Sequence, residues 1–186
     1  MAESARLNPH DNPKPDFIVF DLETTGFDVR THEIIEIGAV RVSSDLTEIR
    51  GTFEEQIQPL HIERAMPDAL AVNGYSDEGW KGAKTLHDAL GAFCTFGSGG
   101  ILAAYNITFD WSFLHMALLK EAIEPPFEYH RFDIFTLAYE YVLATGASEM
   151  KLRAMCARFN IPLPPEPHRA LADARAALAV FRAIRA

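Results

Sequence analysis

The stretch "FIVFDLETTGFD" spans residues 17–28 and places two carboxylates directly after an apolar run. The run over residues 17–20 is typical of a buried strand, and no basic residue lies between Asp21 and Glu23. Residues two positions apart on a strand face the same side, so these acids repel each other unless a proton or a cation lies between them. The stretch therefore predicts a buried strand that ends in a carboxylate site. An exposed strand end with two solvated acids is the ordinary alternative.

Other stretches predict the rest of a sheet and the helices that cover it. "EIIEIGAVRV" (33–42) and "IRGTFEEQIQP" (49–59) continue the two-residue period and predict an antiparallel meander with the first strand. "ILAAYN" (101–106) is expected to be another buried strand. Helices are expected over roughly 85–96, 108–121, 133–145, 149–159 and 168–185. This order predicts one α/β domain over residues 17–186, after a disordered polar tail over residues 1–16.

The composition, 48% hydrophobic and 23% charged, is that of a globular protein, and no stretch is apolar for long enough to span a bilayer. The N-terminus lacks a signal-peptide core, so we expect a cytoplasmic protein with no membrane partner. Cys94 and Cys156 are then expected to be reduced core thiols. The net charge of −9 argues against a general polyanion binder, unless bound dications reverse the local sign.

Two later acids lie on the apolar side of expected helices. Asp110, in "YNITFDWSFLHMALL", precedes Phe113 and Leu114 by three and four positions and so heads the buried face. The alternative is an acid favoured in a first turn by the helix macrodipole. Asp173, in "HRALADARAALAVFRAIR", repeats the placement, with Arg169 four residues earlier as its ordinary ion-pair partner. Carboxylates among apolar neighbours need partners, so both acids are candidate ligands.

His168 follows a proline-rich segment and is expected on the loop before the last helix, from which it can reach the site. Asp133 opens a helix and is expected to be its N-cap. A calcium loop that starts at Asp21 is excluded, because its twelfth position is His32 instead of a glutamate. The remaining histidines are interpreted as surface residues; they are His10, His32, His61, His87, His115 and His130.

The motifs "FDLETTG", "NITFDWSFL" and "HRALADA", with "KLRAMCARFNIP" before the last, occur in the order D-x-E, N-x-x-x-D, H-x-x-x-x-D. This pattern resembles the DEDD superfamily of 3′–5′ exonucleases, in the DEDDh branch with histidine in its third motif. The resemblance runs from Phe17 to Ile184, nearly the whole chain. Tyr105 departs from the pattern, because relatives often have histidine before the asparagine, but this change leaves the chemistry intact.

The resemblance implies a ribonuclease-H-like fold, with a mixed five-stranded sheet flanked by helices. It also implies two Mg²⁺ or Mn²⁺ ions, which suit hard oxygen ligands. His168 would take the proton from the attacking water, a task that suits an imidazole. The four implied metal ligands are Asp21, Glu23, Asp110 and Asp173. The implied substrate-binding residues are Thr24, Thr25, Gly26, Phe27, Tyr75 and Asn106, with Phe27 and Tyr75 against the last base; ordinary core or turn packing is their alternative.

The chain is therefore expected to remove nucleoside 5′-monophosphates from the 3′ end of single-stranded nucleic acid, with DNA ahead of RNA. An exoribonuclease of the same family, acting on RNA or short oligonucleotides, is the first alternative. The second is a catalytically silent module that binds nucleic acid ends or a partner protein. A polymerase or repair partner stays open, although no extension follows the last helix as a tether. A homodimer also stays open.

Overall fold

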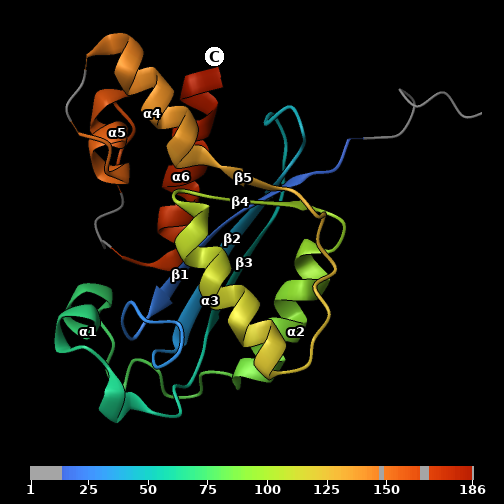
Figure 1. Cartoon of the computed structure of the whole chain (residues 1–186), viewed down its shortest axis with the longest axis vertical. Coiled ribbons are helices and arrows are strands. Elements are labelled where there is room, and N and C mark those ends of the chain that lie inside the picture. Colours follow the sequence, from blue (N-terminus) through green and yellow to red (C-terminus); the bar gives the residue numbers. More distant parts are fainter. Residues whose placement is uncertain (1–13, 147–148, 164–167, 186) are drawn as a thin grey trace, which may run out of the picture.

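The computed structural model describes residues 14–146, 149–163 and 168–185, and its centre is a sheet with helices on both faces (Figure 1). The strands are β1 (Phe17–Thr24), β2 (Ile34–Val42), β3 (Ile49–Gln56), β4 (Ile101–Ala104) and β5 (Arg131–Asp133). The helices are α1 (Pro67–Asn73), α2 (Leu86–Gly97), α3 (Ile107–Lys120), α4 (Ile134–Thr145), α5 (Leu152–Arg158) and α6 (Ala170–Arg185), with a 3-10 turn η1 (Ile62–Arg64).

The strands lie in the order β3-β2-β1-β4-β5. β1, β2 and β3 form the antiparallel meander that the two-residue period predicts. β4 and β5 run parallel to β1, so the sheet is mixed. The predicted fold class, a mixed five-stranded sheet flanked by helices, is confirmed.

β1 lies between two hydrophobic cores and is buried on both faces. Ile18 and Phe20 pack in the core formed with α2 and α3. Val19 packs in the core formed with α4, α5 and α6. Phe17 packs against the same core, and the centre of its ring lies 5.3 Å from that of Phe181. Side chains alternate along a strand, so Asp21 and Glu23 continue the row that faces α6.

Gly38 allows α6 to approach the sheet beside this row. It lies on β2 opposite Asp21. A Cβ atom at this position would be 1.9 Å from the backbone nitrogen of Leu171 and 2.2 Å from the backbone carbon of Ala170. Only glycine leaves room for such a contact, so the first turn of α6 lies directly against the backbone of β2.

Asp133 is confirmed as the N-cap of α4, because its carboxylate accepts a hydrogen bond from the backbone N–H of Thr136 at 3.2 Å. Its other oxygen accepts hydrogen bonds from the backbone N–H groups of Asn106 at 3.1 Å and Ile107 at 3.2 Å. One carboxylate therefore fixes the starts of both α3 and α4. The helix expected from about residue 149 begins at Leu152 instead.

The first 13 residues of the predicted tail lie outside the described part of the chain. Asp16, the last residue of that tail, is anchored by Arg41 at 2.8 Å and Arg50 at 3.2 Å. Cys94 and Cys156 are both free and buried, as expected. Among the described residues, no helix has the length and apolar character needed to cross a membrane.

Candidate active site

The end of β1 brings Asp21 and Glu23 to the α6 face of the sheet. Glu23 is buried, whereas Asp21 retains partial exposure. In the register with β2, Asp21 lies opposite Gly38 and Glu23 lies opposite Glu36, another carboxylate. Like charges directly opposite each other destabilise an antiparallel pair, so this strand end needs positive charge nearby.

Asp110 reaches the same strand from the first turn of α3. Its side chain is buried, and its Oδ1 atom accepts a hydrogen bond from the backbone N–H of Leu22 at 3.1 Å. β1 extends beyond its last pair with β4, at Val19, so β4 does not pair with this part of the strand. Because Leu22 lies between Asp21 and Glu23, the contact places the Asp110 carboxyl beside both acids.

Asp173 lies in the first turn of α6, and His168 lies in the loop just before that helix, as predicted. The His168 Nδ1 atom is 3.9 Å from Asp173 Oδ2. Glu23, His168 and Asp173 each offer one ligand atom within 4.8 Å of the others. The expected alternative for Asp173, an ion pair with Arg169, is wrong. The Arg169 Nε instead donates a hydrogen bond to Glu36 Oε1 at 3.2 Å and forms an ion pair with that carboxylate.

Burial raises the pKa of every acid at this site, and repulsion by the other acids adds to the rise for Asp21 and Glu23. Burial raises the pKa of Glu23 to about 9, with Asp173, Glu36 and Asp110 adding to the rise. Burial also raises the pKa of Asp110 to about 8. The pKa of Asp21 is raised well above its ordinary value by burial and then by Asp110 and Glu23. The pKa of Asp173 is raised by burial, against the opposing effect of His168.

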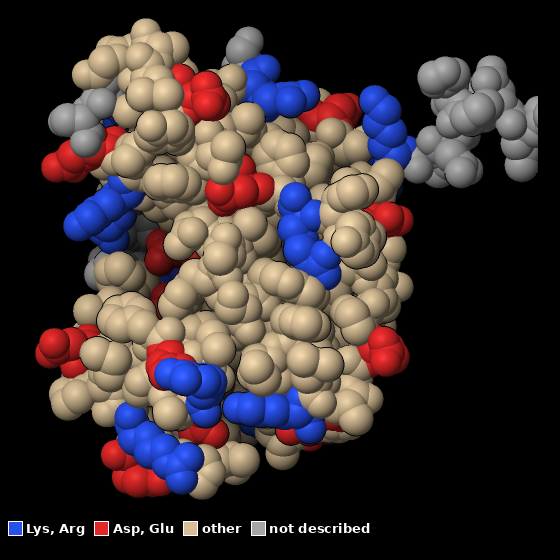
Figure 2. Space-filling model, viewed as in Figure 1, with Lys and Arg blue, Asp and Glu red and all other residues tan. Residues whose placement is uncertain are grey.

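This arrangement fits divalent cations. Several anionic oxygen donors converge in a partly buried space. Burial destabilises each of them as an anion, and mutual repulsion adds to this for Asp21 and Glu23. Hard dications prefer such oxygen ligands and offset the repulsion. Figure 2 shows acidic side chains inside a recess of the surface, between the regions of α1 and α5.

We expect Mg²⁺ to raise the melting temperature by an amount that grows from about pH 6 to about pH 9. The raised pKa values mean that the folded chain holds protons that the unfolded chain releases, so without metal the stability falls as the pH rises. Cations replace those protons and remove this loss. Differential scanning fluorimetry with EDTA or Mg²⁺ across the pH range measures the effect. An equal Mg²⁺ increment at every pH would contradict the assignment of these carboxyls as ligands.

The loop after β1 is fixed from several sides. The carbonyl oxygen of Thr24 accepts a bond from Asn73 Nδ2 at 3.1 Å, and that of Thr25 accepts one from the Met66 N–H at 2.8 Å. Thr25 Oγ1 accepts the N–H of Glu33 at 2.9 Å. A Cβ on Gly26 would lie 2.6 Å from the His32 ring, so this glycine allows the ring to pack on the loop.

Phe27 is 72% exposed beside this loop, with its ring 6.3 Å from that of Phe109, between centroids. This exposure excludes core packing for Phe27 and leaves turn packing, the other form of its alternative, open. Tyr75 follows its alternative more closely: its ring lies 5.0 Å from Trp80, and its hydroxyl bonds Asp77 at 3.2 Å. Asn106 has an exposed side chain at the start of α3, with φ of 71°. The roles of all these residues in substrate binding stay predictions.

Sequence reasoning missed Glu36 and misjudged His32. Glu36 is fully buried, and the only available signal was a strand whose neighbours on both faces are apolar. His32 was expected on the surface, but its Nδ1 atom is buried and has no hydrogen-bond partner among the described residues.

The sequence matches the model of the exonuclease family (RNase_T) over residues 18–181. It is 30% identical over 166 residues to the epsilon subunit of DNA polymerase III from Treponema pallidum, with 89% of this chain and 74% of that protein covered. It is 32% identical over 165 residues to the PolC-type DNA polymerase III of Halalkalibacterium halodurans, with 87% of this chain covered. The chain spans only 11% of that polymerase.

Solved exonucleases share the fold. E. coli exonuclease I in complex with a dT13 oligonucleotide superimposes with a TM-score of 0.77 at 17% identity, over 89% of this chain and 40% of that one. The nuclease domain of 3'hExo, a DEDDh family member bound to rAMP, gives a TM-score of 0.75 at 21% identity, over 94% and 92% of the two chains.

The order of the strands and the helices on both faces of the sheet define a ribonuclease-H-like fold. The chain belongs to the exonuclease family, and its acids and histidine follow the DEDDh pattern.

Proposed function

We propose that the chain is a metal-dependent 3′–5′ exonuclease that hydrolyses the last phosphodiester bond of single-stranded nucleic acid, DNA ahead of RNA. The observation that carries the proposal is the convergence of Asp21, Glu23, Asp110 and Asp173 beside His168 at one strand end. These residues come from three separate segments, and binding alone would not require all of them.

Asp21, Glu23, Asp110 and Asp173 would hold two Mg²⁺ or Mn²⁺ ions, since their oxygens are the donors that these ions prefer. When bound, such a pair compensates the charge of the carboxylates and of the scissile phosphate and polarises that phosphate.

His168 accepts the proton of the attacking water. Its side chain is 42% exposed, so water reaches it, and Asp173 Oδ2 lies 3.9 Å from its Nδ1 atom. The loop from Thr24 to Gly26 presents its backbone to the terminal sugar, and the exposed ring of Phe27 stacks on the last base. The product is a nucleoside 5′-monophosphate.

The relatives support DNA as the first substrate. One is named as a subunit of DNA polymerase III, another as a PolC-type DNA polymerase III, and exonuclease I was solved with dT13. They also support a polymerase partner. The rAMP in 3'hExo supports RNA as the second candidate. A homodimer stays a prediction that light scattering checks.

The test uses 5′-labelled DNA and RNA oligonucleotides of matched sequence, incubated with Mn²⁺ or with EDTA. We expect the labelled strands to shorten stepwise in Mn²⁺, DNA faster than RNA, and to stay intact in EDTA. Immediate release of the labelled 5′ nucleotide would contradict the direction. Binding of strands without any shortening would favour the silent module instead.

We expect Phe27→Ala to raise KM about tenfold with little change in kcat, because base stacking contributes about 1–3 kcal/mol per base. The melting temperature should stay at the wild-type value, since the ring is 72% exposed. Tyr129→Ala, which removes an aromatic ring that is 83% exposed elsewhere, is the matched control. Steady-state kinetics on single-stranded DNA give KM and kcat for both variants. A KM of Phe27→Ala equal to that of the wild type would remove the stacking role.

A further inference from the structure

Glu36 is a buried carboxylate that the proposed reaction does not use. It is 0% exposed and lies on β2 directly opposite Glu23. Burial raises the pKa of Glu36, and Arg169 and the backbone N–H of Ala170 oppose that rise. A buried anion opposite another acid costs free energy unless it is paired, so its partner has a defined position.

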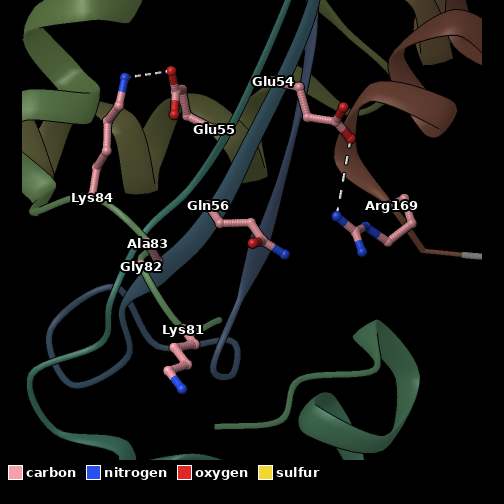
Figure 3. A pocket seen from close by; sticks show the side chains of 8 residues that line it. All are labelled: Glu54, Glu55, Gln56, Lys81, Gly82, Ala83, Lys84 and Arg169. Atoms are coloured by element: carbon pink, nitrogen blue, oxygen red, sulfur yellow. Dashed lines mark hydrogen bonds and ion pairs between the residues drawn. The ribbon is translucent and has the colours of Figure 1, made fainter. Parts of the chain in front are cut away.

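That partner is Arg169, whose Nε lies 3.2 Å from Glu36 Oε1 and 3.1 Å from Oε2, within reach of both oxygens. The guanidinium also lies 4.0 Å from Glu54 on β3 and 5.6 Å from the ring centre of Trp80. Figure 3 shows Arg169 extending toward Glu54 from the chain that leads into α6. These contacts hold the Arg169 side chain against two strands and the buried ring of Trp80. They limit the conformations that this side chain can adopt.

The backbone of Arg169 is part of the candidate active site. Its carbonyl oxygen accepts the N–H of Asp173 at 3.0 Å, which forms the first turn of α6. The residue before it, His168, has a φ of 59°, a left-handed conformation that is strained for a side chain of this kind. Such strain persists only where the surroundings hold the residue in place. Arg169, the residue after His168, contacts the sheet through its side chain.

We propose that the Glu36–Arg169 pair is a positioning element that holds His168 in its strained conformation facing Asp173. The proposal rests on the proposed function, in which His168 accepts a proton. Asp173 depends less on the pair, because α6 is also fixed by its contact at Gly38 and by its buried core. The pair therefore acts on turnover through His168, and leaves cation binding intact.

Glu36→Gln tests this, because it removes the charge and keeps the shape. We expect kcat on single-stranded DNA to fall about 10- to 100-fold, the range that a misplacement of about 1 Å causes. We expect KM and the Mn²⁺ affinity measured by calorimetry to match the wild type. Arg169→Gln should lower kcat as Glu36→Gln does. Arg169→Lys, which keeps the charge without the planar donors, should retain more kcat than Arg169→Gln.

A double-mutant cycle separates positioning from general loosening. If the pair acts through His168, Glu36→Gln causes no further loss of kcat in a His168→Ala background. Arg41→Gln is the matched control, because Arg41 is also on β2 and forms a partly buried ion pair with Asp16 at 2.8 Å. This control should lower the melting temperature and leave kcat unchanged.

Equal losses of kcat in both backgrounds, or a loss of Mn²⁺ affinity, would overturn the inference. So would a fully active Glu36→Gln enzyme. If Glu36→Gln does not fold, Arg169→Gln and Arg169→Lys are compared in the wild-type and His168→Ala backgrounds. Equal losses of kcat in both backgrounds would overturn the inference in that case too. A wild-type protein that releases no mononucleotides would contradict the proposed function, which is a separate result.

Discussion

Asp21→Asn should abolish mononucleotide release and at the same time stabilise the metal-free protein. The substitution keeps the shape of the side chain and removes one anion from a group of acids. Loss of a metal ligand costs several kcal/mol of transition-state stabilisation, which corresponds to a decrease in kcat of at least about 10³-fold.

The stability effect has the opposite sign. The folded-state pKa of Asp21 is raised by burial, Asp110 and Glu23, so above the unfolded-state pKa the ionised carboxylate destabilises the fold. Asparagine cannot ionise, so in EDTA near pH 8 the variant should melt at a higher temperature than the wild type, and Mg²⁺ should add less to it. Glu140→Gln, which removes an exposed acid from α4, is the control. An active variant, or one that melts lower than wild type in EDTA, would contradict the shared site.

His168→Ala should lower kcat about 10²- to 10⁴-fold, the contribution typical of a general base. We expect Mn²⁺ binding to persist, because the four carboxylates remain. His130→Ala, at an exposed residue beside Tyr129, is the control and should keep full activity.

The same variant distinguishes a base from a ligand. His168 lies with Glu23 and Asp173 in a group whose ligand atoms are within 4.8 Å of one another, so a metal-binding role is the competing explanation. Calorimetric titration with Mn²⁺ decides between them. A large loss of affinity in His168→Ala would make the histidine a ligand, and unchanged turnover would remove both roles.

The sequence predicted the elements that carry strong periodic patterns. β1 was predictable from the apolar run over residues 17–20, and α3 from apolar residues at helical spacing such as Phe113, Leu114 and Ala117. β5 and α1 were not predicted. β5 has only three residues, too few to show a period, and α1 buries only Asn73, so it carries no apolar stripe that the sequence could reveal. β5 is held by contacts between segments far apart in the chain, such as the bond from the Asn106 N–H to Asp133.

At the candidate site, the wrong partner for Asp173 and the missed Glu36 have one physical origin. The spacing rule that paired Asp173 with Arg169 assumes an exposed helix, whereas the first turn of α6 faces the sheet. Arg169 therefore finds Glu36 on another strand. Local spacing contains no information on such a partner, which is why Glu36 was missed.

The contact at Gly38 makes the separation of α6 and β2 a property of the main chain. Backbone atoms of Ala170 and Leu171 lie against the glycine, so no side chain acts as a spacer there. Conservative substitutions in the core below α6 can then change volume and stability without moving Asp173 away from β1. The geometry of the candidate active site therefore depends little on which apolar side chains fill the rest of the core.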